Sequence, residues 1–260
     1  MKKKIAVIYG WYNFGEHKGI NEDNRLMTNC FYESAKKHFL PHHDVELIFM
    51  TNSDVSFDGV TNIHFEYKVS CYSEMLLMKI MSLRFLKDEY DYIFVNDNDQ
   101  VYIKDVGDEI LESDFIFVDH FFPSPVEAVH KEVTDIVELN FNTSDEKWTM
   151  GNFFGGKQRN MMELLNIAEE NHKKYFGHNY DGLQFYSRYP DELFILKYVY
   201  ENNVNHKRMN TCVHPLQSPG EYFLSDWGDD DSVPFEVTNV NLLHNTKKNL
   251  NKLRKLYERK

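Results

Sequence analysis

Short hydrophobic runs alternate along the chain with longer stretches in which hydrophobic positions recur at helical spacing. Runs rich in branched or aromatic residues predict buried strands, and they cover residues 4–9, 45–50, 63–69, 90–95, 115–118 and 152–156. Hydrophobic positions three or four residues apart predict helices, and they cover residues 24–40, 73–87, 160–174 and 190–201. This alternation predicts an α/β fold with a mostly parallel central sheet flanked by helices.

The length of 260 residues favours a single domain with one hydrophobic core. No linker, repeat or low-complexity segment divides the chain, so we expect one domain over residues 1–260 with a basic tail over residues 244–260. The positive side chains of the tail are Lys247, Lys248, Lys252, Arg254, Lys255, Arg259 and Lys260. Such a tail is typical of peripheral contact with an anionic membrane surface, or of a solvated helix face.

The overall charge and the cysteines exclude several classes of protein. A formal net charge of -12 disfavours nucleic acid as a partner, because a polyphosphate backbone requires a positive field. The three cysteines are far apart, which indicates neither a disulfide framework nor a zinc site. The first hydrophobic run is too short for a signal peptide or for a membrane span of about 20 residues. We therefore expect a cytoplasmic protein, with peripheral attachment to the inner membrane as an alternative.

An acidic cluster follows the strand predicted over residues 90–95. Asp97 and Asp99, with one residue between them, can ligate one hard cation together. Oxygen ligands favour Mn²⁺ or Mg²⁺. An Asp-x-Asp pair is weak evidence alone, because Asp and Asn are common in turns, but ligands of parallel sheets bind at the carboxyl ends of strands. The cluster therefore predicts an ion that bridges the diphosphate of a nucleotide sugar.

Further chemistry is suggested by two short segments near the end of the chain. In YPDELFILKY, Pro190 starts a helix and Asp191 and Glu192 occupy its first turn. Acids there are often only partners of the helix dipole; the alternative for Glu192 is a carboxylate that faces the anomeric carbon of a sugar. In LLHNTKK, Lys247 can bind a diphosphate as a point charge. His244 is either a third metal ligand or an ordinary histidine.

Taken in order, these segments resemble glycosyltransferase family six, the family of the histo-blood-group A and B transferases. The matching pieces are FYESAKKHFL, DYIFVNDNDQVYIKDVGDEIL, MGNFFGG, DELFILKY, SPGEY and NTKK. They span most of the chain, and alignment on Val106 and Gly107 puts Asp97 and Asp99 on the family's metal-binding pair. Some bacterial members have Asn at both places and need no metal, whereas this chain keeps the carboxylates.

The resemblance implies a GT-A fold and a retaining, Mn²⁺-dependent transfer from a UDP-sugar in an alpha-1,3 linkage. An oligosaccharide or a glycolipid would be the acceptor. Glu192 falls on the catalytic glutamate, which also borders the acceptor, and Asp191 falls on the aspartate that binds the donor hexose. Lys247 matches the lysine that binds the diphosphate. Asp97 and Asn98 would contact the donor as well.

The donor sugar is suggested by Met150, Gly151 and Asn152. In the blood-group enzymes, Met-Gly-Ala before FFGG accompanies UDP-galactose and Leu-Gly-Gly accompanies UDP-GalNAc. A residue larger than glycine should crowd an N-acetyl group, so the resemblance favours galactose, with GalNAc and glucose as alternatives. Tyr12 is the ring expected to stack on uracil.

Other positions depart from the family. Tyr189 and Pro190 occupy the positions at which the family has Trp-His. Tyr189 is therefore expected to contact the acceptor, but through a different side chain from the one that the family uses. His120, in VDHFFP, resembles the family's acceptor-contacting histidine among neighbours that do not match. The arginine of the helix before the metal strand is replaced by Leu77 or Lys79.

Three alternatives stay open. Glycosyltransferase family eight is also retaining and metal-dependent, and its C-terminal metal histidine is loosely echoed by His244 followed by Lys247. A sugar-nucleotide binding module could keep the fold without turnover, but it has no need for both aspartates together with Glu192. A nucleotidyltransferase would require a basic phosphate-binding loop near the N-terminus, and the segment GWYNFGEHKG matches such a loop poorly.

Overall fold

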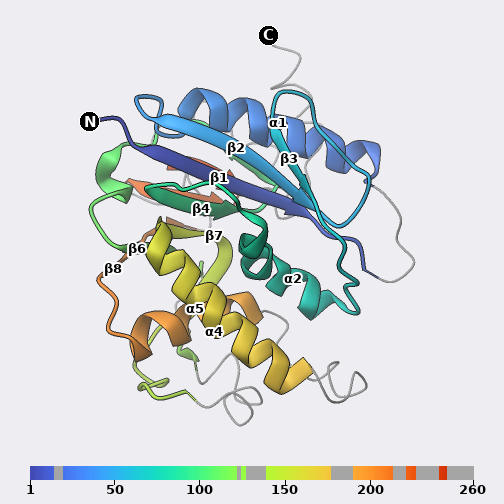
Figure 1. Ribbon diagram of the computed structural model, residues 1–260. Helices are drawn as coiled ribbons and strands as arrows, with labels where there is room; N and C mark the ends of the chain where they lie inside the picture. Colours follow the sequence, from blue (N-terminus) through green and yellow to red (C-terminus); the bar gives the residue numbers. More distant parts are fainter. Residues whose placement is uncertain are drawn as a thin grey trace.

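The computed structural model describes residues 1–14, 20–121, 124–126, 139–176, 190–212, 221–226 and 240–244. The central sheet contains seven strands, β1 (Lys4–Trp11), β2 (Asp44–Thr51), β3 (Thr61–His64), β4 (Tyr92–Asn96), β6 (Phe115–Asp119), β7 (Thr149–Lys157) and β8 (His206–Met209). Their order is β3-β2-β1-β4-β7-β6-β8. The α-helices among these residues are α1 (Glu22–His38), α2 (Tyr72–Met81), α4 (Gln158–Phe176) and α5 (Pro190–Glu201). The α1 helix covers one face of the sheet, and α2, α4 and α5 cover the other (Figure 1).

The α/β class and the mostly parallel sheet are confirmed. Strands β3, β2, β1 and β4 run parallel to one another, and β8 runs parallel to β6. Strand β7 is antiparallel to both of its neighbours, β4 and β6. Its direction was not predicted, because a hydrophobic run does not indicate whether a strand is parallel or antiparallel to its neighbours.

Two predicted elements were too long. The strand expected over residues 63–69 ends at His64, and Val69 forms only an isolated bridge with Phe14. The helix expected over residues 73–87 ends at Met81 and continues as a 3-10 turn, η1 (Ser82–Phe85). The N-cap of α2 is Cys71, so the helix also begins one residue earlier than expected, at Tyr72.

A second, four-stranded sheet was not predicted. It has the order β5-β11-β10-β9 and contains β5 (Gln100–Tyr102), β9 (Thr211–Cys212), β10 (Tyr222–Asp226) and β11 (Val240–His244). Strand β5 begins directly after Asp99 and pairs antiparallel with β11. The second sheet therefore joins the C-terminal part of the described chain to the acidic turn after β4.

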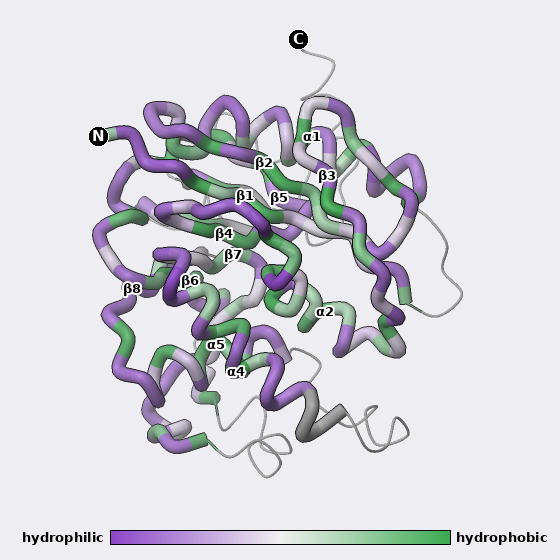
Figure 2. The backbone as a smooth tube through the Cα atoms, viewed as in Figure 1, coloured by the Kyte–Doolittle hydropathy of each residue, from purple (hydrophilic) through white to green (hydrophobic). Residues whose placement is uncertain are grey.

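Both faces of the central sheet are buried. In β1, Ala6 and Ile8 pack with the helices α2, α4 and α5, while Ile5, Val7 and Tyr9 pack on the side of α1. Burial on both faces explains the continuous hydrophobic run of the strand, and Figure 2 shows hydrophobic residues along the central strands β1, β2 and β4. Within the described ranges, no helix combines the length and the hydrophobicity that a membrane span requires.

The beginning of α2 is anchored by a buried carboxylate, Glu74. Its Oε1 accepts a hydrogen bond from the hydroxyl of Tyr67 (2.9 Å) and lies 3.1 Å from Nε2 of His172 on α4. The main-chain N–H and the hydroxyl of Ser70 donate to Oε2. Burial raises the pKa of Glu74, but these hydrogen bonds outweigh burial and hold the pKa at about 2. The helix that carries Lys79 is thereby fixed to α4.

Candidate active site

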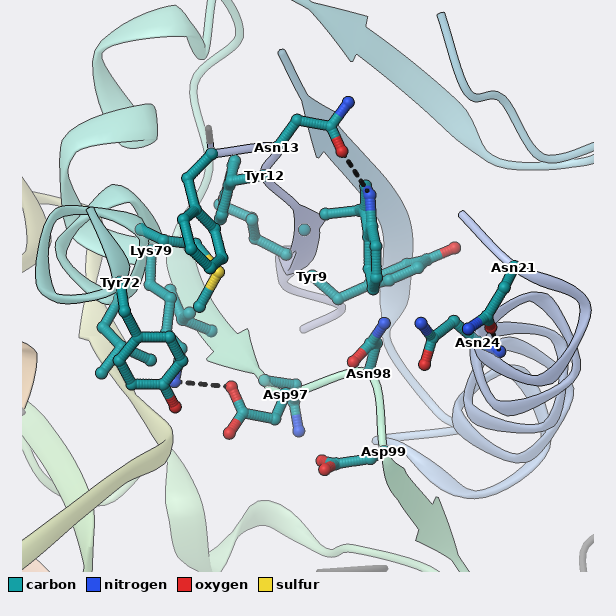
Figure 3. Close-up of a pocket in the computed structure, with 18 residues that line it drawn as sticks. Tyr9, Tyr12, Asn13, Asn21, Asn24, Tyr72, Lys79, Asp97, Asn98 and Asp99 are labelled. Atoms are coloured by element: carbon teal, nitrogen blue, oxygen red, sulfur yellow. Dashed lines mark hydrogen bonds and ion pairs between the residues drawn. The ribbon is translucent and has the colours of Figure 1, made fainter. Parts of the chain in front are cut away.

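A cavity of about 570 Å³ lies at the carboxyl ends of β1 and β4. Its walls come from β1 and the residues after it, from the start of α1, from α2, and from the turn that follows β4. Asp97, Asn98 and Asp99 lie on that turn, and Lys79 and Tyr72 approach from α2 (Figure 3). The position agrees with the rule that open α/β sheets bind ligands beyond the carboxyl ends of their strands, and the volume is typical of small-molecule sites.

A buried cation, Lys79, connects this cavity to α5. Its Nζ lies 2.6 Å from Oδ1 of Asp97 and 3.3 Å from Oδ2 of Asp191, and it donates to the carbonyl of Gly151 (3.1 Å). Burial lowers the pKa of Lys79, but attraction to the two carboxylates outweighs burial, so the pKa is raised above its usual value. Lys79 is therefore charged, and one ammonium group reaches both acidic segments of the candidate site.

Strand β7 is irregular beside these groups. Phe117 pairs with Phe154 and the next residue of β6, Val118, pairs with Met150, so the register shifts between them. Pairing with β4 continues, and the main-chain N–H of Asp97 donates to the carbonyl of Asn152 (3.0 Å). Such bulges commonly occur next to active sites, where they redirect groups. Here the main chain of β7 contacts Asp97.

Gly151 lies within this irregular part of β7. A Cβ at this position would lie 2.1 Å from Oδ2 of Asp191 and 3.2 Å from Cγ of Glu192. The first distance is far below van der Waals contact, so any side chain at residue 151 would displace Asp191. Glycine is therefore required for β7 to approach the start of α5 this closely.

Glu192 accepts a hydrogen bond at each of its carboxylate oxygens. The main-chain N–H of Gly151 donates to Oε1 (2.9 Å), and the indole Nε1 of Trp148 donates to Oε2 (2.5 Å). Burial and repulsion by Asp191 raise the pKa of Glu192, against the hydrogen bonds from Gly151 and Trp148 and the charge of Lys79. A buried carboxylate with a raised pKa and fixed oxygens is a candidate for catalysis rather than a simple partner of the helix dipole.

Asp97, Gly151, Asp191 and Glu192, all singled out from the sequence, form one connected group. Asp97 lines the cavity, and Lys79 links it to Asp191. Asp191 and Glu192 are buried, with exposed fractions of 1% and 8%, and lie behind Lys79 rather than on the cavity wall. A sugar that reached Glu192 would have to lie beyond the Lys79 ammonium.

Asn152 and Met150 differ in their surroundings. Asn152 is 4% exposed, and within the described part of the chain neither side-chain atom, Oδ1 or Nδ2, has a hydrogen-bond partner. A buried amide without partners costs free energy, so a ligand that bonded to it would gain affinity. Met150 packs in the core on the α1 side of the sheet, together with Tyr9 and Phe153.

The aromatic residues of the cavity differ in exposure. Tyr12 lines the cavity but is buried, with its hydroxyl 3.0 Å from Oγ of Ser82 and its ring packed near Phe65. Its stacking on uracil stays a prediction. Tyr72, which the sequence did not single out, is 49% exposed at the same cavity, with its ring near Phe14. About half of Tyr72 is therefore accessible beside the cavity.

The predicted acceptor and phosphate residues are only partly described. His120 follows β6, and its main-chain N–H donates to the carbonyl of Trp148 (3.3 Å), which brings it near the Trp148 segment. Tyr189 and Lys247 lie outside the described residues. Their predicted roles at the acceptor and at the diphosphate stay predictions.

The residues present are compatible with a hard divalent cation. Asp97 and Asp99 both border the cavity, and their carboxylate oxygens suit Mn²⁺ or Mg²⁺. No group of three or more acidic, histidine or cysteine side chains that could hold a metal occurs among the described residues. A diphosphate and water would therefore have to complete the coordination shell. The main chain of His244 pairs with Gln100, the residue after Asp99.

Comparison with models of known protein families finds no match, and comparison with curated proteins finds none either.

Lys79→Met is expected to lower the free energy of unfolding by about 3 kcal/mol, because it leaves Asp97 and the buried Asp191 without their shared cation. Chemical denaturation at pH 7 measures the change. Lys197→Met is the matched control: Lys197 has the same exposed side-chain fraction, 14%, and pairs with Glu201 on its own helix. We expect a loss below about 1 kcal/mol there. Equal stability of Lys79→Met and the unmodified protein would contradict the bridging role.

Proposed function

We propose that this protein is a retaining glycosyltransferase with a GT-A fold, which transfers galactose from UDP-galactose to a sugar acceptor in an alpha-1,3 linkage. GalNAc and glucose are the alternative donor sugars. One observation carries the proposal: Asp97 at the end of the central strand and the pair Asp191 and Glu192 at the start of α5 converge on Lys79 beside a cavity. A buried glutamate with two hydrogen bonds next to a ligand cavity is more typical of an enzyme than of a protein that only binds its ligand.

In the proposed complex the UDP moiety occupies the cavity. Asp97 and Asp99 would hold Mn²⁺ or Mg²⁺, and when bound the ion neutralises the charge that grows on the departing diphosphate. The exposed ring of Tyr72 and the buried ring of Tyr12 both border this space. Lys79, positioned between Asp97 and Asp191, would donate hydrogen bonds to the donor.

Glu192 would act on the sugar itself. As a carboxylate it either stabilises the positive charge that develops on the anomeric carbon or attacks that carbon, and both courses give retention. The Gly151 and Trp148 N–H groups hold its two oxygens in fixed directions, which supports a preorganised role. The carboxylate of Asp191 can accept hydrogen bonds from sugar hydroxyls, since its Oδ1 has no hydrogen-bond partner among the described residues.

The choice of donor sugar would involve Asn152. Asn152 follows Gly151 on β7, and its amide is buried and lacks hydrogen-bond partners within the described ranges, so it can bond to a hydroxyl of galactose or glucose. The bulk of an asparagine would also oppose the N-acetyl group of GalNAc. We therefore expect UDP-galactose to be the preferred donor.

The experiment that tests this proposal measures UDP released from UDP-galactose, UDP-GalNAc and UDP-glucose, each with Mn²⁺ and with a chelator. We expect release that depends on Mn²⁺, is fastest with UDP-galactose and rises when an oligosaccharide acceptor is added. UDP binding without release from any donor would favour a non-catalytic sugar-nucleotide module instead. An oligosaccharide or glycolipid acceptor, and contact of residues 244–260 with a membrane, stay predictions.

A second candidate is a retaining transferase of the family-eight kind. The register of β11 supports it, because the His244 main chain lies beside Gln100, next to the Asp97 and Asp99 turn. A histidine in this strand position is suited to complete a metal site after ligand binding. His244→Ala should then weaken Mn²⁺ binding at least tenfold, whereas a family-six arrangement leaves Mn²⁺ binding unchanged.

A further inference from the structure

Arg208, on β8, makes more polar contacts than any role in the sheet edge requires. Its side chain is 19% exposed, and its guanidinium lies over the ring of Phe117, 5.0 Å from the centroid. Its guanidinium donates from Nε to Asp119 Oδ1 (2.5 Å), from Nη1 to the Tyr200 hydroxyl (2.9 Å), and from Nη2 to the carbonyls of Lys147 (3.0 Å) and Trp148 (3.1 Å). Nη1 also lies 3.9 Å from Oε2 of Glu146. A planar guanidinium can make these bonds together, which an ammonium cannot.

These contacts join β6 and β7 where their pairing is irregular. Asp119 is the last residue of β6, and Lys147 and Trp148 lie just before β7. The register of the two strands shifts between Phe117 and Val118. The hydrogen bonding between β6 and β7 is therefore less regular at this end of the strands. At this place Arg208 adds side-chain hydrogen bonds that connect the two strands.

The same end of β7 contacts Glu192. The Trp148 side chain is buried, with an exposed fraction of 1%, and its indole N–H donates to Oε2 of Glu192. The Trp148 carbonyl accepts hydrogen bonds from Arg208 and from the main-chain N–H of His120. A continuous set of contacts therefore leads from Arg208 through Trp148 to the candidate catalytic carboxylate.

We propose that Arg208 is a positioning residue that holds the Trp148 indole against Glu192 and thereby fixes the orientation of the Glu192 carboxylate for reaction with the donor sugar. The kinetic part of this inference rests on the proposed transferase function. The structural part, that Arg208 sets the position of the Trp148 indole, is independent of it. The two parts are therefore tested by different measurements.

The structural measurement uses the ¹⁵N-labelled full chain and follows the indole N–H resonance of Trp148, assigned with Trp148→Phe. In Arg208→Gln we expect this resonance to move toward the position of a solvent-exposed indole. Arg208→Lys keeps the charge near Asp119 but not both carbonyl contacts, so an intermediate shift is expected. Tyr200→Phe removes one contact of Arg208 and should give a smaller shift in the same direction. These two milder variants serve if Arg208→Gln fails to fold.

The kinetic measurement is the transfer from UDP-galactose in the same variants. A misplaced catalytic group typically loses about 100-fold in rate, so kcat of Arg208→Gln should fall by about that factor, with the donor KM changed less than about threefold. Arg84→Gln is the matched control, because Arg84 pairs with Glu169 (2.9 Å) and contacts neither Trp148 nor Asp119 in any described interaction. Its Trp148 resonance and kcat should stay unchanged.

An unmoved Trp148 resonance in folded Arg208→Gln would overturn the inference, as would an equal shift in Arg84→Gln. A fall in kcat with a parallel loss of UDP binding would show that Arg208 acts on the fold of the whole site, and would overturn the kinetic part. If the unmodified protein releases no UDP from any donor, the transferase proposal fails while the indole resonance still decides the role of Arg208.

Discussion

Glu192→Gln is expected to reduce kcat for hexose transfer by about four orders of magnitude, a loss typical of removing a group that acts directly on the reacting carbon. The amide cannot stabilise or attack a positively charged anomeric carbon as a carboxylate does. UDP binding measured by calorimetry should change little, because Glu192 is not on the wall of the cavity. Glu201→Gln, at the other end of α5 and paired with Lys197, is the control and should retain full activity.

The pH dependence of transfer follows from the same residue. Burial, followed by repulsion from Asp191, raises the pKa of Glu192 above the ordinary value of 4.5. Because the carboxylate is the active form, the rate should fall as pH decreases through this raised pKa, so the acidic limb lies above pH 4.5. Normal turnover by Glu192→Gln, or a limb at the pKa of an ordinary glutamate, would contradict the assignment.

Asp97→Asn and Asp99→Asn are each expected to abolish the Mn²⁺-stimulated part of transfer. Each change removes a charged oxygen ligand, and electron paramagnetic resonance should report Mn²⁺ affinity reduced by more than about tenfold. Asp97→Asn also removes one charged partner of Lys79, so the free energy of unfolding of this variant should fall as well. Asp105→Asn, an exposed acid in the loop after β5 that pairs with His38, is the control. Transfer that is unchanged in the presence of a chelator would refute the metal requirement.

The sequence predicted those parts of the fold that depend on local periodicity. The bounds of α5 agree with residues 190–201, and β1, β2, β4 and β6 were found within about two residues, because each is a buried run or an amphipathic stretch. The direction of β7 and the second sheet were not predicted. Strands β5 and β9 have three and two residues, which is too short for a periodic pattern, and their pairing is decided by partners distant in sequence.

The sequence predicted the acidic residues of the candidate site, but it did not predict the residues that contact and position them. Asp97 and Glu192 stand out as acids at a strand end and at a helix start. Lys79 was noticed only as a replacement for an arginine of the resembled family, and Trp148 and Arg208 were not noticed. Their importance comes from contacts across large sequence separations, such as the 44 residues between Trp148 and Glu192, and no local pattern marks such contacts.

The most direct test of the central claim is a crystal structure of the protein with UDP-galactose and Mn²⁺. The ion is predicted to lie between the diphosphate and the carboxylates of Asp97 and Asp99, with the anomeric carbon facing the carboxylate of Glu192. An ion bound elsewhere, or a donor sugar directed away from Glu192, would contradict the proposed transferase.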